Sequence, residues 1–415
     1  MEILETALFA LALLVAVPTG FILLQSLAAQ PLPPVPRGSP PGPRSSMAVL
    51  IPAHDEQDSI AEVLVSLRPQ LASADRVLVV ADNCGDATAE RARAMGAEVV
   101  ARTDPERRGK GYALAFGIDH LRAAPPAILV IVDADCRLEP GALDHLAQSV
   151  QHSGRPGQAA YLMGFGAGDL EARAGDLKAV SAFAFFFKNW VRPLGLKRLG
   201  LPCQLTGSGT ALPWELIARV PPDTANLVED MQLGVDLTRL GYPPAFVPRA
   251  LVWSRLPDRS APALAQRRRW EHGHLATALH QGPRLLGHSI ASRDAAGLAL
   301  ALDLMVPPLS LLALGGALLW ALCAGAWWIG ASAAPWLIAT LALGSLAGAV
   351  FCAWHRHGRA RLKARTLLAA PFYAVRKLPL YLAFWTRREQ EWVRTERSSS
   401  PRDPADGERN SQDGA

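Results

Sequence analysis

Carboxylates follow three of the short apolar runs in the middle of the chain. Glu56 follows the first run, Asp82 the second, and Asp133 and Asp135 the fourth. Asp favours turns, so any one of them could be a solvated turn residue, but three such run ends together favour a site. Asp133 and Asp135 are two apart, and on an extended backbone both point to one face. Two such carboxylates bind Mg²⁺ or Mn²⁺ incompletely and leave positions for water and phosphates, which predicts a metal–diphosphate site.

Two glycine-containing segments could bring the backbone close to a ligand. Arg108–Gly111 is expected to open a helix, where backbone N–H groups and Lys110 could meet a phosphate. It is not a Walker A loop, and no GxGxxG lies between a strand and a helix. Gly207–Thr210 predicts a flexible turn, which by itself is a weak indication of a site.

Glu229 and Asp230 fall in the first turn of a helix that is expected to run to about Leu240. The helix dipole keeps a carboxylate at this position ionised, as a general base requires. Ordinary charge at a helix N-terminus is the alternative interpretation, and these two residues alone do not decide between them.

The letters QRRRW begin at Gln266. On a helix Gln266, Arg269 and Trp270 share one face, at positions i, i+3 and i+4. That face offers an amide, a guanidinium for a diphosphate and a large ring for stacking. Arg267 and Arg268 point elsewhere and could contact anionic lipid headgroups, so a purely lipid-binding helix is the alternative.

The elements that must position these residues are readable from periodicity. Short apolar runs alternate with amphipathic helical patterns, which predicts an α/β domain with a mostly parallel sheet. In such sheets ligands bind beyond the carboxyl ends of the strands, where the carboxylates described above are found. The expected strands are 47–51, 77–80, 98–100 and 127–132, and the helices after them begin near Ser59, Asp86, Lys110 and Pro140.

Composition is uneven along the 415 residues, of which 50% are apolar and 19% charged. No charged residue lies between Thr6 and Pro36, and Asp303 is the only one between Ala295 and Trp354. The block between these stretches has an ordinary globular composition, which excludes a many-span transporter, a disordered chain and a collagen-like fibre.

The spacing of the cysteines and the net charge exclude further kinds of site and partner. The five cysteines are scattered with no CxxC, so we expect neither a zinc cluster nor an extracellular disulfide framework. The net charge is +5 and the pI about 9.1. Much of the basic character lies beside the expected membrane segments, so lipid headgroups and a sugar diphosphate are expected as partners, and nucleic acid is not.

The first 30 residues predict a membrane anchor. The apolar stretch Ala7–Ala29 is long enough to cross the ~30 Å hydrocarbon layer. A cleaved signal peptide is the competing interpretation, but it would begin with basic residues, whereas this N-terminus carries two glutamates. The first basic residues, Arg37 and Arg44, follow the stretch and place its C-terminal side in the cytoplasm. Residues 31–45, rich in proline, predict a semi-rigid spacer rather than an SH3-type ligand.

The C-terminal part predicts a hairpin of two spans within residues 295–354. The spans are expected at Leu298–Ala324 and Ala333–Trp354, and the basic segment after them is expected in the cytoplasm. Both ends of the chain therefore predict a cytosolic domain over residues 46–292.

The last apolar segment is different, because Arg376 and Lys377 stand at its centre. Two central charges make full spanning expensive, so residues 355–386 predict a basic segment followed by a helix lying in the membrane interface. Residues 387–415 are polar and charged and predict a disordered tail.

Taken in order, these residues resemble the membrane branch of the family 2 glycosyltransferases, with its D, DxD, ED and QxxRW pattern. Cellulose and hyaluronan synthases and ceramide glucosyltransferase belong to that branch. The resemblance covers about Val49–Trp270 and the flanking membrane segments. It implies a GT-A type nucleotide-sugar-binding domain and an enzyme that uses Mg²⁺ or Mn²⁺.

The resemblance also implies roles for single residues. The loop from Pro52 to Glu56 would line the nucleotide, Asp82 would bind a uracil, and Lys110 would bind the donor. Asp133 and Asp135 would form the DxD, with Asp135 as the direct metal ligand, and Asp230 would be the catalytic base. Gly207, Ser208 and Glu229 would belong to the acceptor site, and Gln266, Arg269 and Trp270 would hold the diphosphate, with Trp270 also at the acceptor.

The sequence departs from the family pattern in two places. His54 and Asp55 stand where an aromatic residue and Asn are usual, and Val228 replaces a Thr before the two carboxylates. Neither change removes a carboxylate of the expected site.

The implied reaction is inverting transfer of a sugar, from a UDP-sugar in the first instance, to a polysaccharide or lipid-linked acceptor at the cytosolic membrane face. QxxRW favours a processive synthase, as in exopolysaccharide biosynthesis, whereas the few spans favour a single transfer to a lipid. A membrane-anchored scaffold that kept the fold and lost activity is the alternative class, and the intact carboxylates argue against it. The oligomeric state is left open.

Overall fold

The structure is a computed structural model. It describes residues 2–33, 44–164, 176–220, 228–254, 261–360 and 362–386, with the backbone alone at 176, 261–267 and 385. The expected disordered tail and most of the expected spacer lie outside these residues. All five cysteines are among the described residues and are free thiols.

The first half of the sheet is parallel, as predicted. Its strands follow the order β3-β2-β1-β4, and each of the three pairings is parallel. Every expected strand is present, and the helices after them begin within three residues of the expected positions. The elements are β1 (Met47–Ala53), α2 (Ile60–Leu67), η1 (Arg68–Gln70), β2 (Arg76–Asp82), α3 (Thr88–Ala94), β3 (Glu98–Arg102), α4 (Lys110–Leu121), β4 (Ile128–Ile131) and α5 (Ala142–Ser153).

The second half of the sheet is mixed and was not read from periodicity. It continues the order as β4-β7-β6-β8-β5, with β4–β7, β6–β7 and β5–β8 antiparallel and β6–β8 parallel. The sheet is therefore an eight-stranded mixed one, parallel only over its first half and in one later pairing. The added elements are β5 (Cys136–Leu138), β6 (Gly157–Met163), β7 (Thr210–Pro213), α8 (Trp214–Ile217), α9 (Glu229–Arg239) and β8 (Ala245–Ser254).

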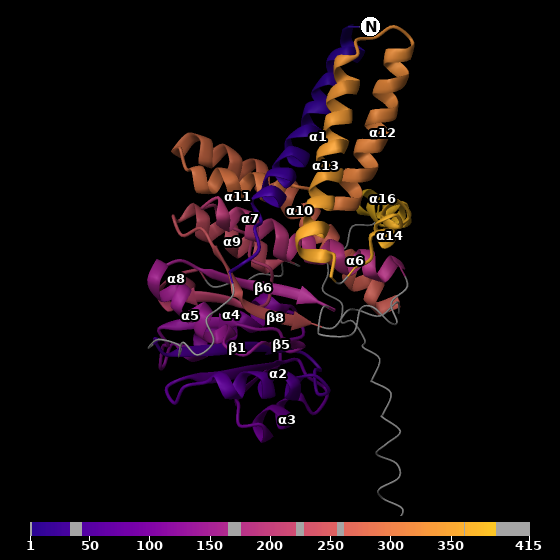
Figure 1. Cartoon of the computed structure of the whole chain (residues 1–415). Helices are drawn as coiled ribbons and strands as arrows, with labels where there is room; N and C mark the ends of the chain where they lie inside the picture. The colour runs from indigo at the N-terminus through magenta and orange to yellow at the C-terminus, as the bar shows by residue number, and fades with distance from the viewer. Residues whose placement is uncertain are drawn as a thin grey trace, which may run out of the picture.

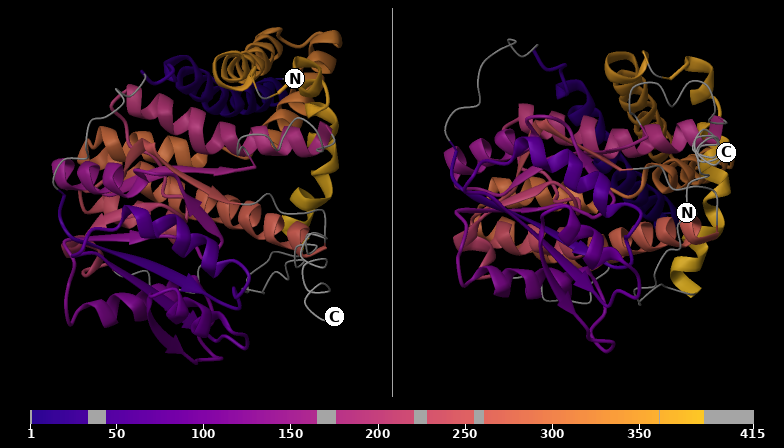
Figure 2. Two further views of the ribbon diagram at one scale, coloured as in Figure 1. Left: turned by 60° about the horizontal axis from the view of Figure 1, so that its bottom comes forward. Right: turned by 90° about the horizontal axis from the view of Figure 1, so that it is seen from below.

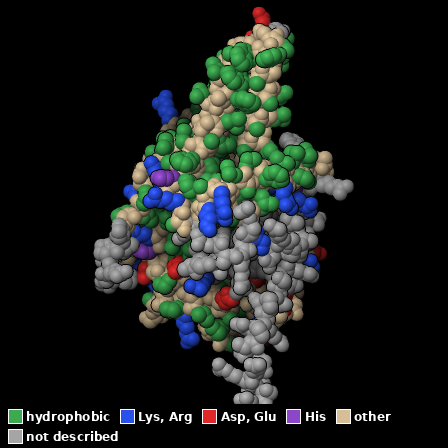
Figure 3. Space-filling model, turned by 45° about the vertical axis from the view of Figure 1, so that its right-hand side comes forward, with side chains coloured by type: hydrophobic (Ala, Val, Ile, Leu, Met, Phe, Trp, Pro, Cys, Tyr) green, Lys and Arg blue, Asp and Glu red, His purple; other side chains and the backbone are tan. Residues whose placement is uncertain are grey.

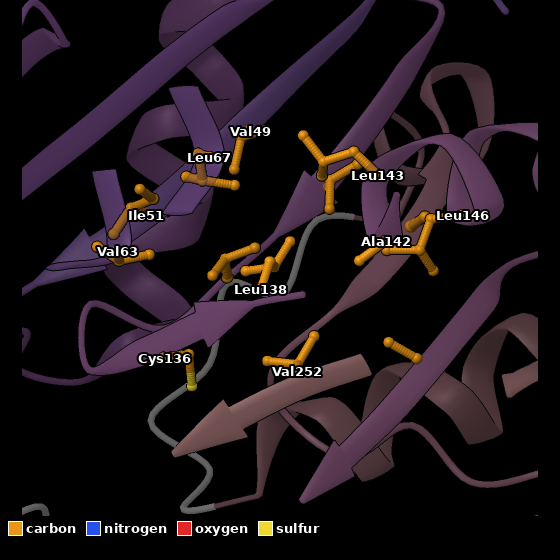
Figure 4. Close-up of a cluster of buried hydrophobic side chains, with 14 of the residues drawn as sticks. Val49, Ile51, Val63, Leu67, Cys136, Leu138, Ala142, Leu143, Leu146 and Val252 are labelled. Carbon is orange, nitrogen blue, oxygen red and sulfur yellow. The ribbon is translucent and has the colours of Figure 1, made fainter. Parts of the chain in front are cut away.

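Alternating side chains along the central strands build two buried layers. Val49 and Ile51 of β1 face α2 and α5, in the cluster that Figure 4 shows. Leu50, between them, faces the opposite layer formed with α4, α8 and α9. This period of two is expected for a strand covered by helices on both faces. The parallel pairing of β1 with β2 and with β4 sets the register of their carboxyl ends.

A layer of helices separates the sheet from an apolar bundle (Figures 1 and 2). The layer contains α6 (Asp176–Phe186), the π-helical turn η2 (Phe187–Val191), α7 (Arg192–Arg198), α10 (Ala261–Ser292) and α11 (Ala295–Met305). The helix carrying the QRRRW letters is therefore placed between the sheet and the bundle.

The apolar bundle consists of α1 (Glu2–Ala28), α12 (Leu309–Trp328) and α13 (Ala334–Ala353), which project from the α/β domain (Figure 1). Hydrophobic and small side chains cover it, and Lys and Arg gather around its base (Figure 3). Among the described residues four helical segments are long and apolar enough to cross a membrane, namely Glu2–Ala28, Leu309–Trp328, Ala334–Gly358 and Ala364–Phe384.

Two segments of the C-terminal region are interrupted, although each was expected to form one continuous helix. The run expected as one span from Leu298 is divided, because Pro307 and Pro308 stand between α11 and α12 and proline cannot continue a helix. The segment after α13 is divided as well. It comprises η3 (Trp354–Gly358), α14 (Ala364–Leu367), α15 (Ala370–Arg376) and α16 (Leu378–Thr386).

Helix α1 is fastened to the α/β domain by close packing. A Cβ added to Gly195 of α7 would lie 2.0 Å from the carbonyl oxygen of Gln25, so only glycine permits this approach. At the other end of α1 the Glu5 carboxylate accepts a hydrogen bond from Ser332 N–H (3.1 Å), in the loop joining α12 and α13. Helix α1 is therefore part of the folded unit.

Asp303, the single charged residue of the C-terminal apolar stretch, completes a buried polar network. Its carboxylate accepts hydrogen bonds from Arg192 (2.6 Å), Gln25 (2.7 Å) and Gln204 (2.7 Å). These partners come from α7, α1 and the segment before β7, so one carboxylate joins helix α1 to the α/β domain. Its role in the fold is structural.

We expect Asp303→Asn to destabilise the protein strongly. The substitution leaves the Arg192 guanidinium buried without its counter-charge, and breaking a buried pair in this way costs about 3–5 kcal/mol. Thermal unfolding in detergent should show a midpoint lower by on the order of 10 °C. Asp119→Asn, at an exposed pair with Arg122, is the control, and an equal midpoint for both variants would contradict the expectation.

Candidate active site

The carboxyl ends of the three central strands meet at one edge of the sheet, as the sequence predicts. Ala53 of β1 pairs with Ala81 of β2, and Leu50 pairs with Ile131 of β4. Asp82 at the end of β2 and the loop holding Asp133 after β4 therefore lie at the same edge, on either side of β1.

The approach of Asp133 to Asp135 has a different cause from the one expected. Strand β4 ends at Ile131, and the two residues lie in a turn closed by a hydrogen bond from Cys136 N–H to the Asp133 carbonyl (3.1 Å). The turn, and not the alternation of a strand, brings ligand atoms of both residues within 4.8 Å of each other.

Lys110 joins three segments that are distant in the sequence. Its ammonium lies 2.6 Å from the Asp133 carboxylate and 3.4 Å from that of Glu229, and it donates to the Gly207 carbonyl (2.8 Å). Lys110 is the first residue of α4, after Gly109, whose φ of 137° favours glycine. The lysine thus lies at the centre of the expected site.

Asp230 lies in the same cluster. A Cβ added to Gly207 would lie 3.4 Å from the Asp230 carboxylate, 3.6 Å from the Lys110 ammonium and 3.8 Å from the Asp133 carboxylate. Gly207 has a φ of 79°, which also favours glycine. The small pocket at this point is lined by Lys110, Leu114, Ile131, Leu205, Gly207, Thr210, Glu229, Asp230 and Leu233.

The charged side chains of the cluster shift one another's pKa values. Burial alone would lower the pKa of Lys110, but the carboxylates of Asp133, Glu229 and Asp230 raise it above its usual range. Burial raises the pKa of Asp133, and the charge of Asp135 adds to this effect while Lys110 opposes it. Several carboxylates around one ammonium form a site with an excess of negative charge, as a cation-binding site requires.

Asp230 differs from the expectation that the helix dipole keeps it readily ionised. Burial raises its pKa, although Lys110 and the backbone N–H of Met231 oppose the shift. A carboxylate with a raised pKa accepts a proton more readily than an exposed one, which suits general base catalysis. Glu229 and Asp230 do begin α9, as predicted.

The residues near Asp135 fit a hard divalent cation. Asp133, Asp135 and Cys136 place possible ligand atoms within 4.8 Å of one another. Burial raises the pKa of the Cys136 thiol, so the sulfur stays protonated and the carboxylate oxygens are the available ligands. Oxygen ligands with free positions for water and phosphate are what Mg²⁺ and Mn²⁺ prefer.

We expect Glu229→Gln to stabilise the metal-free protein at neutral pH. Burial raises the pKa of Glu229, so between its unfolded and folded pKa values the folded state binds more protons, and stability falls as pH rises through that window. Above it Gln removes the cost of a buried charge, by about 1 kcal/mol or ~2–4 °C. Thermal unfolding in EDTA at pH 7.5 and pH 4 should show this gain only at the higher pH. A gain at both values, or at neither, would contradict the electrostatic cause.

The loop Gly207–Thr210 is partly placed as expected. Gly207 lines the pocket, whereas Ser208 is fully buried and its hydroxyl accepts a hydrogen bond from Asp133 N–H (3.1 Å). Ser208 thus holds the aspartate turn from a buried position, and its expected acceptor contact stays a prediction. Buried Gln158 fixes the same loop through the Ser208 carbonyl (2.9 Å) and the Thr210 hydroxyl (2.9 Å).

Asp82 is buried in an ion pair that sequence reasoning missed. Its Oδ1 accepts from Arg102 of β3 (2.6 Å) and from Asn83 (3.1 Å). The Arg102 guanidinium also lies 5.7 Å from the centre of the Tyr112 ring. The sequence did contain a signal for this pair, because Arg102 ends the third apolar run and Asp82 ends the second, and the two strands are neighbours.

Pro52 and Glu56 lie in and after β1, beside the loop that follows Asp82. Pro52 pairs with Val80 in the strand register, and the Glu56 backbone N–H donates to the Thr88 hydroxyl (2.8 Å). The Glu56 carboxylate accepts from Ser59. Both residues therefore lie near Asp82, at the edge formed by the carboxyl ends of the strands.

The QRRRW letters lie on one helix, α10, as predicted. The Trp270 ring packs against the buried cluster under the sheet edge, together with Phe185. Arg269 is half-buried on the same helix. The Gln266 side chain lies outside the described residues.

Lys188 is a second residue that sequence reasoning missed. It lies in the π-helical turn η2 after α6, a rare element that is often found at functional sites. Burial lowers its pKa, the charge of Arg192 adds to this, and that of Asp230 opposes it. A lone lysine within an aromatic run was the available signal.

The eight-stranded mixed sheet with a carboxylate-lined edge defines a GT-A-like glycosyltransferase domain. Residues 43–273, more than half of the chain, match the family model described as Glycosyltransferase like family 2. The chain belongs to this family and carries a glycosyltransferase family 2 domain.

Two known proteins are similar to the chain. Probable glycosyltransferase YdaM of Bacillus subtilis (strain 168) is 24% identical over 242 residues, which cover 55% of each protein. The chain thus spans about half the length of this curated relative. The mannosyltransferase PcManGT from Pyrobaculum calidifontis, solved in complex with GDP-Man and Mn²⁺, has a TM-score of 0.51 at 20% identity, covering 89% of this chain and 98% of that one. At this identity the likeness shows the fold alone.

Proposed function

We propose that this glycosyltransferase moves a sugar, with inversion, from a nucleoside-diphosphate donor to a hydroxyl of a polysaccharide or lipid-linked acceptor at the cytosolic membrane face. The observation that carries the proposal is the grouping of Lys110, Asp133, Glu229 and Asp230 around Gly207. Two carboxylates lie within 3.4 Å of the Lys110 ammonium.

The proposed reaction gives a role to three members of the group, Asp230, Lys110 and Asp133. Asp230 takes the proton from the acceptor hydroxyl as the oxygen attacks the anomeric carbon. Lys110 and Arg269 face the negative charge that grows on the departing diphosphate. A divalent cation held by Asp135 and Asp133 would neutralise part of that charge.

For the donor base we favour uracil. Asp82 and Arg102 lie side by side, so the pair offers a carboxylate acceptor next to guanidinium donors. Uracil presents an N–H between two carbonyl groups and matches this arrangement. Guanine also presents an N–H beside a carbonyl, so a GDP-sugar is the competing donor and must be included in the test.

The proposed position of the α/β domain on the cytosolic face of the membrane rests on how α1 packs against that domain. The C-terminal end of α1, with Gln25, packs on Gly195 of the domain, while Glu5 lies at the far tip of the bundle. Together with the basic residues that follow the first apolar stretch, this supports a domain on the cytosolic face. We keep residues 364–386 as an interfacial segment, because Arg376 and Lys377 stand at its centre.

The test uses membranes containing the full chain and a panel of radiolabelled UDP- and GDP-sugars with Mg²⁺ or Mn²⁺. We expect transfer of label from one UDP-sugar, inversion at the anomeric carbon by NMR, and a product size on gel filtration that distinguishes a polymer from a single addition. Consumption of no donor would favour the inactive scaffold, and use of a GDP-sugar alone would overturn the uracil assignment.

A further inference from the structure

Helix α10 is held on two sides by different parts of the molecule. Trp270 packs against the buried cluster under the sheet, whereas the next two residues contact the segment after the apolar bundle. We call helices α15 and α16, residues 370–386, the clamp segment. The arginine and tryptophan expected to hold the donor diphosphate are therefore adjacent in sequence to contacts with the clamp segment.

The first contact is a partly buried ion pair. The Lys377 ammonium pairs with the Glu271 carboxylate, and both side chains are 15% exposed. The same ammonium lies 4.9 Å from the centre of the Tyr373 ring, and the Tyr373 hydroxyl donates to Ser181 of α6 (3.1 Å). Lys377 and its neighbour thus fasten the clamp segment to α10 and to α6.

The second contact involves His272, which is fully buried. Its Nε2–H donates to the Leu380 carbonyl (2.9 Å), and its ring meets that of Phe384 edge to face at 5.4 Å. Tyr381 and Phe384 pack with Leu275 of α10. The contacts therefore extend over more than one turn of α10, directly after Trp270.

The opposite face of the clamp segment is apolar and exposed. Phe372, Val375 and Leu382 are 76%, 57% and 59% exposed. Single exposed apolar residues are ordinary, but three on one short segment beside an apolar bundle suit the lipid interface. The clamp segment thus has a lipid-directed face and a face that holds α10.

A partly buried ion pair is a poor way to gain stability, because the desolvation of the two charges offsets much of their attraction. Apolar residues would fill the same volume, whereas a charge pair specifies one partner and one register. We propose that Glu271 and Lys377 are positioning residues for sugar transfer, which hold Arg269 and Trp270 against the donor site through the lipid-bound clamp segment. This inference rests on the proposed function.

The test compares Glu271→Gln, Lys377→Gln and the charge-exchanged double variant Glu271→Lys/Lys377→Glu, in full-length protein in nanodiscs. An interaction that acts in the transition state lowers kcat and kcat/KM together. We expect about 10-fold lower kcat in each single variant, with a donor KM within about 3-fold of wild type, and kcat within about 3-fold of wild type in the double variant. Glu98→Gln, which breaks the half-exposed pair with Arg76, is the matched control and should keep wild-type kcat.

A second readout does not depend on activity. Hydrogen exchange of the backbone around residues 268–276 should be faster in both single variants and return to the wild-type rate in the double variant. Single variants that lose thermal stability but keep wild-type kcat and exchange would overturn the proposal, since the pair would then be structural only. If the single variants do not fold, a folded double variant with kcat below a tenth of wild type would overturn it as well.

The two proposals can fail separately. Absence of transfer by the wild-type protein from any donor would refute the proposed function, whereas the exchange measurement would still test the contact between α10 and the clamp segment. Normal transfer by the wild type with unaltered single variants would refute the positioning role alone.

Discussion

Asp230→Asn is expected to lower kcat about 10³-fold while the protein still binds donor and metal. The substitution keeps the size of the side chain and removes its basicity, and general base catalysis contributes roughly 10²–10⁴-fold. Donor binding should persist because Lys110, Asp133 and Asp135 are unchanged. The measurement is the initial rate of transfer at saturating donor, beside binding of the nucleoside diphosphate by calorimetry.

The matched control for this variant lies on the same helix. Asp236, two turns further along α9, pairs with Gln232 (2.9 Å) and Arg239 (3.8 Å) away from the cluster. Asp236→Asn should keep wild-type kcat. Equal transfer by wild type and Asp230→Asn would show that the base is another group.

The same residue predicts a pH dependence. Because burial raises the pKa of Asp230, the acidic limb of kcat/KM should lie above pH ~3.9, the value for an ordinary aspartate. Activity is lost as pH falls through the raised pKa, because the protonated carboxyl cannot accept the acceptor's proton. A rate that is constant down to pH 4 would contradict this assignment.

Asp135→Asn is expected to abolish most metal-dependent activity. One oxygen ligand is replaced by a neutral amide, and even changes outside the ligand shell typically cost 10–100-fold in metal affinity or activity. The Mn²⁺ concentration for half-maximal transfer should rise at least about 10-fold. EDTA should abolish wild-type transfer, and Mg²⁺ or Mn²⁺ should restore it.

A second cluster on the same edge provides the control for the metal. Asp55, Cys84 and Asp86 also place possible ligand atoms within 4.8 Å of one another, but the Asp55 carboxylate accepts from Gly85 N–H (2.7 Å) and that of Asp86 from Gln57 N–H (3.1 Å). Electron paramagnetic resonance of bound Mn²⁺ should therefore show loss in Asp135→Asn and retention in Asp55→Asn. The reverse pattern would place the ion in the second cluster.

Local sequence patterns were sufficient for the parallel half of the sheet and for the edge that bears the site. Strands such as β1 and β4 are short apolar runs bounded by turn residues, and parallel pairing places the residues that follow them at one edge. The same reasoning located the first residues of α4 and α9, because Gly109 and the acidic pair Glu229–Asp230 are signals confined to a few residues.

Other features depend on residues far apart in the chain. Ser208 reads as part of a glycine-rich acceptor loop, and only the packing of β7 beside β4 turns its hydroxyl to Asp133. Arg102 and Asp82 belong to separate strands. Asp303 reads as an isolated charge in a membrane segment until α1 and α7 surround it.

The sequence alone thus determined the class of protein and its parallel strands and predicted most residues of the candidate site, since these depend on periodicity and on short local signals. Only the tertiary structure decided which charges neighbour which. Lys110 meets Glu229, and Glu271 meets Lys377, across more than one hundred residues in each case. No local period encodes such pairs, because their energies depend on burial, and burial exists only when the distant segments have packed together.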